Sequence, residues 1–250
     1  YGHRSTVADA ERTLNKYTEY MESEGARVAS ALMDTPGMRQ VSEAEGRGGC
    51  RCLYPSAGGR LFGVFGNSVV EFDSNWNRIW RFYLRSTSGR VTMVDNGSQL
   101  FIADGTGHDG WIYDLTLNTA ARITDVNYPG GYFATYLDGL FGCEVPGTDK
   151  WQWPTLNDGN VWPGLNFVHA EGFPDSIVSV VCTNLEVWMF GTKSVEVWYH
   201  SSDPTFVFQR FPSAVIPIGC AAPWAVAEIS GVIFWIGSAS NGYGSIWMSQ

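Results

Sequence analysis

Charged side chains are scarce in this sequence, and basic ones are scarcer than acidic ones. Only 16% of the 250 residues are Asp, Glu, Lys or Arg, and 16 basic residues stand against 25 acidic ones, for a formal net charge of −9. A general duplex DNA-binding protein draws most of its affinity from phosphates neutralised by Lys and Arg. The charge balance therefore argues against that class of protein.

Cysteine is too sparse and too scattered to build a disulfide framework. The five residues, an odd number, are Cys50, Cys52, Cys143, Cys182 and Cys220. In a chain of this length that pattern predicts buried free thiols in a reducing compartment. The first twelve residues are polar and charged, so no signal peptide is predicted, and the absence of an initiator methionine indicates a processed or trimmed chain.

Long apolar runs are also missing. Phe211–Ala227 and Ile229–Gln250 contain no charged residue, but prolines interrupt the first stretch, and Gly, Ser and Asn dilute the second. A membrane helix needs about 20 consecutive, predominantly apolar residues. Short apolar runs between turn residues instead favour buried strands, and we predict no membrane span.

The loop at residues 104–110 matches parts of two functional motifs but lacks the flanking sequence that those motifs require. Gly105, Gly107 and Gly110 match the dinucleotide-binding pattern G-x-G-x-x-G, but a strand-like run, Trp111–Asp114, follows where the motif requires a helix. We therefore expect a hairpin loop. Asp104, His108 and Asp109 lie in the same loop and could hold a cation, but their spacing is not that of a calcium loop.

Other candidate groups are isolated. Cys50-x-Cys52 has no second Cys pair or nearby His for zinc, and Glu171 and Asp175 form a lone acidic pair that a surface turn explains. The sequence has no G-x-S-x-G motif, and no nucleophile–base pattern includes its four histidines, which are His3, His108, His169 and His200. We predict no catalytic, cofactor-binding or metal-binding residues and no cofactor.

The sequence is rich in aromatic residues and glycine, and it contains an internal repeat. Aromatics make up 14% of the chain, and there are 29 Gly. A short apolar run recurs five times, with spacings of 39, 40, 47 and 46 residues between the first residues of Leu61–Gly66, Leu100–Gly105, Leu140–Val145, Val187–Thr192 and Ile233–Ser238. A turn precedes each run, and Asn96-Gly97 and Asp138-Gly139 are strong hairpin signals.

Strand-like runs flank these repeats and complete a four-stranded unit. Examples are Ile177–Cys182 before the fourth run, and Ser194–His200 and Phe206–Phe211 after it. Four strands every ~40–50 residues are typical of propeller blades, because one small sheet cannot cover both of its faces and neighbouring blades must stack. We predict an all-β protein, a β-propeller of four-stranded antiparallel blades; a β-sandwich is the alternative.

The domain boundaries follow from the same repeat. Residues 38–250 are predicted to form a propeller-like domain of about five blade units, the last of them incomplete. Residues 1–37 are predicted to be an N-terminal arm that ends at the turn Thr35-Pro36-Gly37. Within the arm, Val7–Met21 has the composition of an amphipathic helix, with an extended segment as the alternative.

Charge is unevenly distributed along the chain. Residues 47–90 contain seven arginines, whereas residues 151–250 contain only Lys193 and Arg210 against seven acids. An ordinary solvated face with ion pairs is one interpretation of the arginines, and a docking face for an acidic partner is the other. The two segments could also meet head to tail between neighbouring subunits, as heterologous contacts in rings do.

Several ordered motifs give the chain a family resemblance. It resembles the tail hub or nozzle proteins of short-tailed phages, the packaged DNA stabilisation family. The most specific stretch is Leu185–Tyr199 (LEVWMFGTKSVEVWY), and the other matching segments are Arg4-Ser5-Thr6, Asn15–Glu19, Thr35-Pro36-Gly37, Val94–Gly97, Tyr136–Gly139, Phe167–Asp175, Phe208–Arg210 and Gly219–Pro223. The chain has Lys16-Tyr17 where the family pattern favours Leu-Tyr, and members of the family usually run beyond this length.

The resemblance implies a structural protein of the virion tail, assembled in the host cytoplasm. It implies a homo-oligomer, a hexameric ring that continues the DNA channel below the portal and its adaptor and helps retain and deliver the genome. Tail fibres, spikes or a plug would be its further partners, and DNA would pass without sequence-specific binding. No catalytic residues come with the resemblance, and the acidic balance suits a wall along which DNA slides.

Two other functions remain open from the residues. A propeller glycosidase is favoured if several acids face a common cleft. A carbohydrate-binding propeller is favoured if tryptophans are exposed at equivalent positions of the blades.

Overall fold

The computed structural model describes residues 16–20, 30–34, 37, 39–42, 48–173, 175–201, 203, 206–238 and 244–249. The chain divides into two compact units, residues 1–41 and residues 42–250. In the first unit, β1 (Lys16–Tyr20) pairs antiparallel with β2 (Ser30–Asp34). The helical alternative for Val7–Met21 is therefore wrong over residues 16–20, and residues 7–15 and 21 lie outside the described residues.

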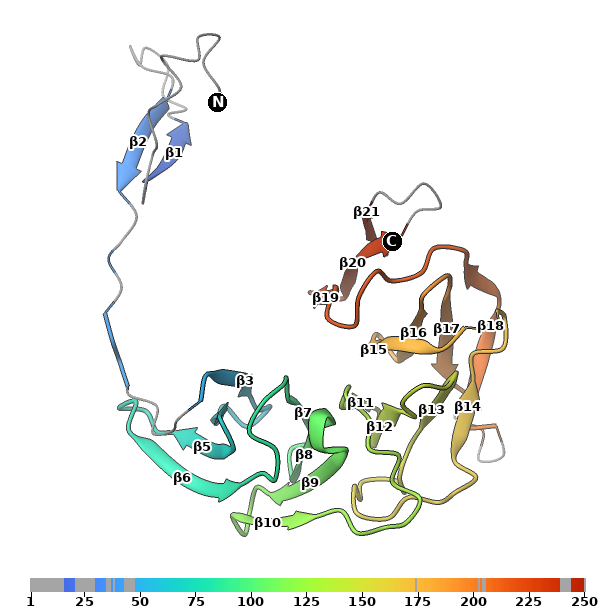
Figure 1. Ribbon diagram of the computed structural model, residues 1–250, viewed down its shortest axis with the longest axis horizontal. Coiled ribbons are helices and arrows are strands. Elements are labelled where there is room, and N and C mark those ends of the chain that lie inside the picture. The colour runs from blue at the N-terminus through green and yellow to red at the C-terminus, as the bar shows by residue number, and fades with distance from the viewer. Residues whose placement is uncertain are drawn as a thin grey trace. The chain divides into compact units, whose positions relative to one another are not determined.

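The second unit consists of five antiparallel sheets, which we call blades 1 to 5 in chain order (Figure 1). In each blade, strands that are consecutive in sequence are neighbours in the sheet. The strands are β3 (Cys50–Pro55), β4 (Leu61–Phe65), β5 (Ser68–Phe72) and β6 (Arg78–Tyr83) in blade 1; β7 (Thr92–Asp95), β8 (Gln99–Asp104), β9 (Asp109–Asp114) and β10 (Thr119–Arg122) in blade 2; β11 (Thr135–Leu137), β12 (Leu140–Glu144), β13 (Lys150–Gln152) and β14 (Phe167–His169) in blade 3; β15 (Ile177–Thr183), β16 (Glu186–Gly191), β17 (Val195–His200) and β18 (Phe208–Ile216) in blade 4; and β19 (Val226–Ile229), β20 (Val232–Ser238) and β21 (Gly244–Met248) in blade 5.

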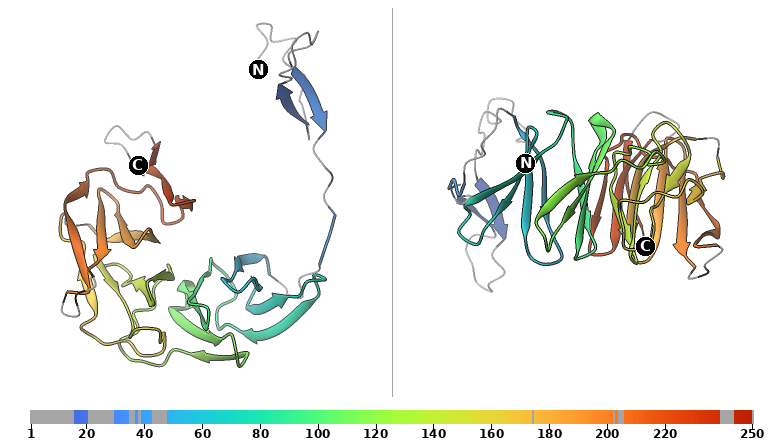
Figure 2. Two further views of the ribbon diagram at one scale, coloured as in Figure 1. Left: turned by 180° about the vertical axis from the view of Figure 1, so that it is seen from behind. Right: turned by 90° about the horizontal axis from the view of Figure 1, so that it is seen from below.

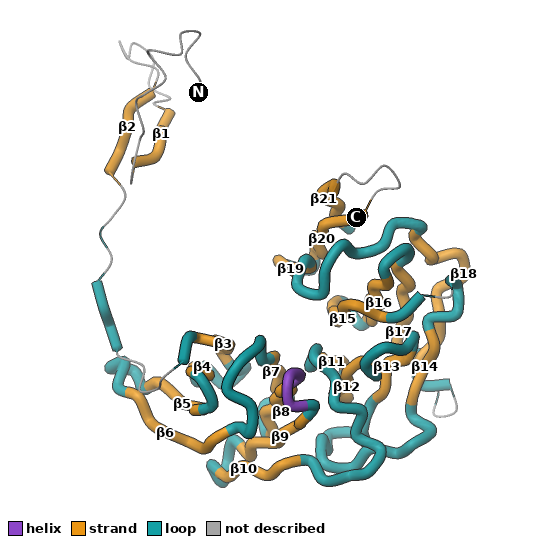
Figure 3. Tube along the Cα trace, viewed as in Figure 1, coloured by secondary structure: helices purple, strands orange, loops and turns teal. Residues whose placement is uncertain are grey.

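The first strands of successive blades lie next to one another. β3 contacts β7, β7 contacts β11, β11 contacts β15, and β15 contacts β19. Figures 1 and 2 show these strands on the inner side of the curve of blades, with β6, β10, β14 and β18 on the outer side. In the described residues the only helical element of this unit is a 3-10 turn, η1 (Gly105–Gly107), between β8 and β9 (Figure 3). The predicted propeller of mostly four-stranded blades is confirmed.

The five apolar runs occupy equivalent places, since they form the second strands β4, β8, β12, β16 and β20. A turn precedes each of these strands, and positive backbone φ angles explain why the turns contain Gly, Asn and Asp. Asp138 and Gly139 have φ of 47° and 83°, and Gly97 has φ of 85°. Two positive values in succession are what a tight two-residue hairpin requires.

The second strands are apolar on both faces because a blade covers each face. In β8, Leu100 and Ile102 pack into the core shared with blade 1, whereas Phe101 and Ala103 pack into the core shared with blade 3. In β16, Met189 faces blade 3 and Phe190 faces blade 5. Burying each such large side chain contributes about 1.5–3 kcal/mol, so stability depends on the stacking of blades.

Candidate functional site: buried charge clusters, cavities and uncovered blade faces

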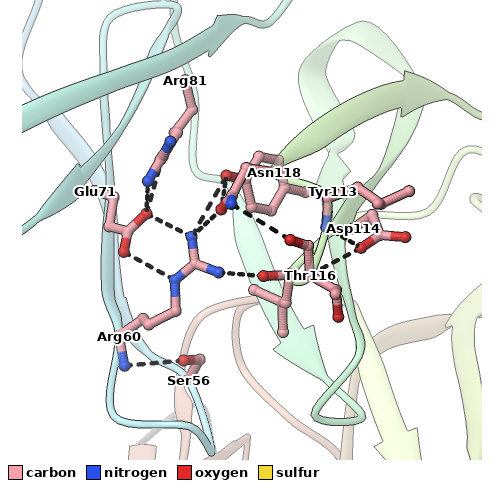
Figure 4. Close-up of polar contacts among 10 residues, drawn as sticks. Ser56, Arg60, Glu71, Arg81, Tyr113, Asp114, Thr116 and Asn118 are labelled. Atoms are coloured by element: carbon pink, nitrogen blue, oxygen red, sulfur yellow. Dashed lines mark hydrogen bonds and ion pairs between the residues drawn. The ribbon is translucent and has the colours of Figure 1, made fainter.

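An arginine–carboxylate cluster joins blades 1 and 2 (Figure 4). Arg60, just before β4, binds Glu71 of β5 with two hydrogen bonds, from Nε to Oε1 at 2.8 Å and from Nη2 to Oε2 at 2.6 Å. The same guanidinium donates to the Leu115 carbonyl and to Oδ1 of Asn118, both at 2.6 Å, in the β9–β10 turn of blade 2. Arg60 therefore connects two blades through charged, bidentate hydrogen bonding.

A second arginine, Arg81 of β6, also binds Glu71. Arg81 of β6 donates to Glu71 Oε2 through Nε at 2.9 Å. Burial alone would raise the pKa of Glu71, but hydrogen bonds from Arg60 and Arg81 outweigh it and hold that pKa below its usual value.

Arg51 forms the most buried ion pair between the same blades. Its Nη2 lies 2.8 Å from Oδ1 of Asp104, and the two side chains are 5% and 0% exposed. The guanidinium also donates to the carbonyls of Gly66, Ser86, Ser88 and Gly89, at 2.6–3.0 Å. It thereby fixes β3, the β4–β5 turn and the connection into blade 2 around one carboxylate.

These contacts explain most of the arginine-rich segment. Arg51, Arg60 and Arg81 are largely buried in ion pairs, and Arg85 lies 3.7 Å from Asp109, which Arg122 also binds at 2.6 Å. The ion-pair part of the first interpretation therefore fits these arginines better than a docking face does, but Arg51, Arg60 and Arg81 do not lie on a solvated face. Arg47 lies outside the described residues.

The loop with the G-x-G-x-x-G pattern is a hairpin, as expected. η1 leads directly into β9, and no helix follows to hold a pyrophosphate. Asp104 and Asp109 are bound by arginines, and the Nδ1 atom of His108 lies 3.1 Å from the Gly130 carbonyl oxygen. In the described residues, no three His, Cys, Asp or Glu side chains gather as metal ligands would.

The acidic pair in the loop before blade 4 separates into two environments. Asp175 accepts hydrogen bonds from Thr192 Oγ1 at 2.6 Å and from the Lys193 amide at 2.5 Å, so it caps the β16–β17 turn. Glu171 is exposed. Of the histidines, His169 and His200 contact Asp149 and Asp138 at 3.0 and 2.8 Å, and His3 lies outside the described residues.

All five cysteines are free. Cys143 and Cys220 are buried as expected, Cys52 and Cys182 are half-buried, and Cys50 is exposed. Burial raises the pKa of both half-buried thiols to about 12. Thiolate chemistry at those two positions is thereby suppressed.

A cavity of about 240 Å³ beside the inner strands of blades 3 and 4 contains a buried carboxylate that the sequence analysis missed. Glu144, at the end of β12, is 2% exposed, and its two oxygens accept hydrogen bonds from the amides of Tyr132 and Phe133 at 2.5 and 3.0 Å. Burial raises the pKa of Glu144 to about 7. The sequence signal that could have indicated this buried acid is a single carboxylate at the end of an apolar run, Leu140–Glu144 (LFGCE).

Two further cavities lie in the second unit. One of about 330 Å³ is lined by residues of all five blades or their connections, among them Tyr54, Arg90, Phe133, Ser179 and Trp224. The other, of about 480 Å³, lies between blades 3 and 4 and includes Trp153, His200 and Asp203. None of the three cavities is lined by two described carboxylates.

The outward faces of the first and last blades carry exposed apolar side chains, and no other blade packs on them. In blade 1, Leu53 pairs with Gly63, Gly63 with Val70, and Val70 with Trp80, so these four residues lie on one face of the sheet. On this side of the blade Leu53, Trp80 and Tyr83 are each more than half exposed. In blade 5 the corresponding face carries Ile229, Ile236, Ile246 and Met248, of which Ile246 is 79% exposed. In the described residues β21 also has no neighbour on its outer edge. Large exposed apolar faces and open strand edges mark interaction sites.

Comparisons with known proteins agree with this architecture. A family model described as "Bacteriophage P22 Gp10, beta-propeller" matches residues 13–250. No curated protein matches the chain. Among solved structures, virginiamycin B lyase from Staphylococcus aureus has a TM-score of 0.54 at 11% identity, over 93% of this chain and 77% of the lyase. The extracellular domain of a putative one-component system from B. thetaiotaomicron has a TM-score of 0.51 at 12% identity, over 94% of this chain and 32% of that one.

At such low identity the two structures share the fold alone with this chain. No described helix has the length and apolar character needed to cross a membrane.

Proposed function

This chain belongs to the family of bacteriophage P22 Gp10 β-propellers, and from that membership we propose that it is a structural protein of a phage tail hub or nozzle. In this proposal it forms a ring, a homohexamer, that continues the DNA channel below the portal and its adaptor and helps retain and deliver the packaged genome. Tail fibres, spikes or a plug bind the assembled ring, and the protein is located in the virion tail after assembly in the host cytoplasm.

The uncovered end faces carry the assembly part of the proposal. Five stacked blades bury four interfaces, but the outward faces of blades 1 and 5 present apolar side chains to solvent. Such faces are stable in a particle only when another protein surface or a further sheet covers them. The net charge of −9 favours sliding of DNA past the protein over tight binding.

We further propose that the protein is not an enzyme and that it has no catalytic, cofactor-binding or metal-binding residues. The discriminating features of the two alternatives argue against both. No described cavity gathers two carboxylates for glycoside hydrolysis. The exposed tryptophans are Trp76 in a turn, Trp80 on a fourth strand and Trp247 on a third strand, so they are not at equivalent positions of the blades. We also propose residues 1–37 as an arm separate from a propeller domain of residues 38–250.

The test is assembly. The mass of the purified protein, alone and with the neighbouring tail proteins, and electron cryomicroscopy of the particle would show a ring of identical subunits. Replacing Trp80 or Ile246 by Ser should weaken assembly, whereas the control Leu117→Ser, at a turn residue that is 71% exposed and lies away from both faces, should not. A monomer in the assembled particle would refute the proposal.

A further inference from the structure

Among the buried carboxylates of the described chain, Glu144 and Asp95 are paired with no described arginine or lysine, and Asp95 instead accepts hydrogen bonds from the Tyr54 hydroxyl and from the amides of Ala57 and Gly97. Arg60 and Arg81 bind Glu71, Arg51 binds Asp104, and Arg210 lies 3.7 Å from Glu196. Glu144 has two backbone amides instead, and no described lysine or arginine pairs with it. Each carboxylate oxygen accepts through about two lone pairs, so acceptor capacity remains on both oxygens.

The wall of the cavity supplies the second observation. Besides Glu144 it includes the aromatic side chains Tyr132, Phe133 and Trp224, together with Ile177 and Val178 of β15. The rings of Phe133 and Trp224 lie 4.5 Å apart. Aromatic faces attract cations through their quadrupole, and a buried acid among several rings is the chemistry that recognises an organic cation.

Trp224 already shows this attraction elsewhere. The Arg90 guanidinium lies 5.2 Å from the centre of its ring. Arg90 lines the neighbouring cavity of about 330 Å³ and not the Glu144 cavity, so it leaves the carboxylate unpaired. The Glu144 cavity, at about 240 Å³, is smaller than the ~300–1,000 Å³ of sites for drug-sized ligands. Its occupant must therefore be a small group.

We propose that the Glu144 cavity binds an alkylammonium group, supplied either by a small free amine or by a lysine side chain of a partner protein. The ammonium would donate to the Glu144 carboxylate, and its methylene groups would contact Trp224, Phe133 and Ile177. The inference is independent of the proposed role in the phage tail.

Binding should depend on the ionisation of Glu144. The carboxylate loses its proton as the pH rises through about 7, so affinity for the cation should increase over that interval. The titratable groups near Glu144 are Tyr132 on the cavity wall, and Cys143 and Tyr128 behind it; burial raises the pKa of Cys143 and of Tyr128 well above the ordinary range. The walls from β15 and from the connection to blade 5 contribute no titratable side chain.

Isothermal titration calorimetry above pH ~7 tests the proposal. The probes are n-butylammonium, Nα-acetyl-lysine methylamide, and n-butanol as an uncharged isostere. Both ammonium probes or one of them should bind, and n-butanol should bind at least about tenfold more weakly, because a charge-assisted hydrogen bond is lost. Preference for the lysine derivative identifies a protein source, and preference for n-butylammonium identifies a free amine.

Two variants and a control make the result decisive. Glu144→Gln should weaken ammonium binding at least about tenfold. Trp224→Leu keeps the carboxylate and should weaken binding about two- to thirtyfold through loss of the cation–π contact, which tests the site even if the Gln variant does not fold. Glu171→Gln, at an exposed acid outside the cavity, should leave binding unchanged. Failure of both ammonium probes to bind, equal binding of n-butanol, or unchanged binding in Glu144→Gln would overturn the proposal.

Discussion

The buried carboxylate of Glu144 gives a sharp prediction for the pH dependence of stability. Its pKa is about 7 in the folded chain against 4.5 for an unperturbed glutamate. A raised folded-state pKa means that the folded state binds the proton more tightly than the unfolded state. The stabilising contribution of protonated Glu144 is therefore complete below pH ~4.5 and is lost as the pH rises through about 7.

The magnitude follows from the shift. A tenfold change in a proton-binding constant corresponds to about 1.4 kcal/mol, so the rise of the Glu144 pKa from 4.5 to about 7 amounts to roughly 3 kcal/mol. Glu144→Gln mimics the protonated side chain at all pH values. The free energy of unfolding of the Gln variant minus that of the wild type should therefore increase by about 3 kcal/mol between pH ~4.5 and pH ~8.

Urea denaturation of both proteins at several pH values measures this difference. Glu171→Gln is the control, because its carboxylate is exposed and the difference should stay close to zero. A wild-type-minus-variant difference that does not change with pH would show that Glu144 does not take up a proton on folding and would refute the reasoning.

Three further perturbations test the blade contacts. Arg51→Met leaves Asp104 buried without its partner and should cost about 3–5 kcal/mol of unfolding free energy in urea titrations, whereas Arg85→Met, whose side chain is 64% exposed, should cost less than about 1 kcal/mol. Gly142→Ala places a Cβ 2.2 Å from the Trp151 ring and should lower stability by about 1–3 kcal/mol, whereas Gly49→Ala, with no atom within 4 Å, should change it by less than about 0.5 kcal/mol. Glu71 has a lowered pKa, so its contribution to the free energy of unfolding is present at neutral pH and is lost as the pH falls through its folded-state pKa. The stability advantage of wild type over Glu71→Gln should therefore shrink in acid. An advantage that is constant with pH would contradict the assignment.

The repeat and the turn chemistry made the fold predictable from the sequence. Five apolar runs with regular spacing identified all five second strands, and the Asp138-Gly139 pair predicted a hairpin whose positive φ angles the structure confirms. The pattern works because each second strand is covered on both faces, so it contains few polar residues and stands out from its surroundings.

Two strands of the blades, β3 and β14, were not predicted from the sequence, and each has a physical reason. β3 contains Arg51, whose side chain is buried in an ion pair and breaks the apolar pattern of the strand, and it ends at Pro55. β14 has only three residues and follows a connection that contains Pro163 and Gly164. In the first unit, the composition of Val7–Met21 suggested a helix, but residues 16–20 form a strand, because pairing with β2 overrides a weak local preference.

The buried charge clusters were less predictable. An acid in an apolar strand, such as Glu71 or Glu144, has the same local sequence signal whether an arginine or a backbone amide receives it. Arg60 and Asn118 are 58 residues apart, and only the stacking of two blades brings them within 2.6 Å of each other. Sequence spacing alone could not distinguish such a contact from a solvated surface charge.

The uneven charge distribution acquires a structural meaning from these contacts. Arginines are concentrated in residues 47–90, and there they neutralise the carboxylates buried between blades 1 and 2. Residues 151–250 contain only Lys193 and Arg210, and Arg210 lies beside Glu196. The basic residue of blade 3, Lys150, lies with its Nζ 4.5 Å from the centre of the Phe167 ring and does not pair with Glu144. The burial of Glu144 must therefore be compensated by backbone amides, by a proton, or by a cation from outside the chain. The amides are present at every pH, whereas the proton leaves as the pH rises through about 7, and above that pH the proposed alkylammonium group would restore part of the lost stability.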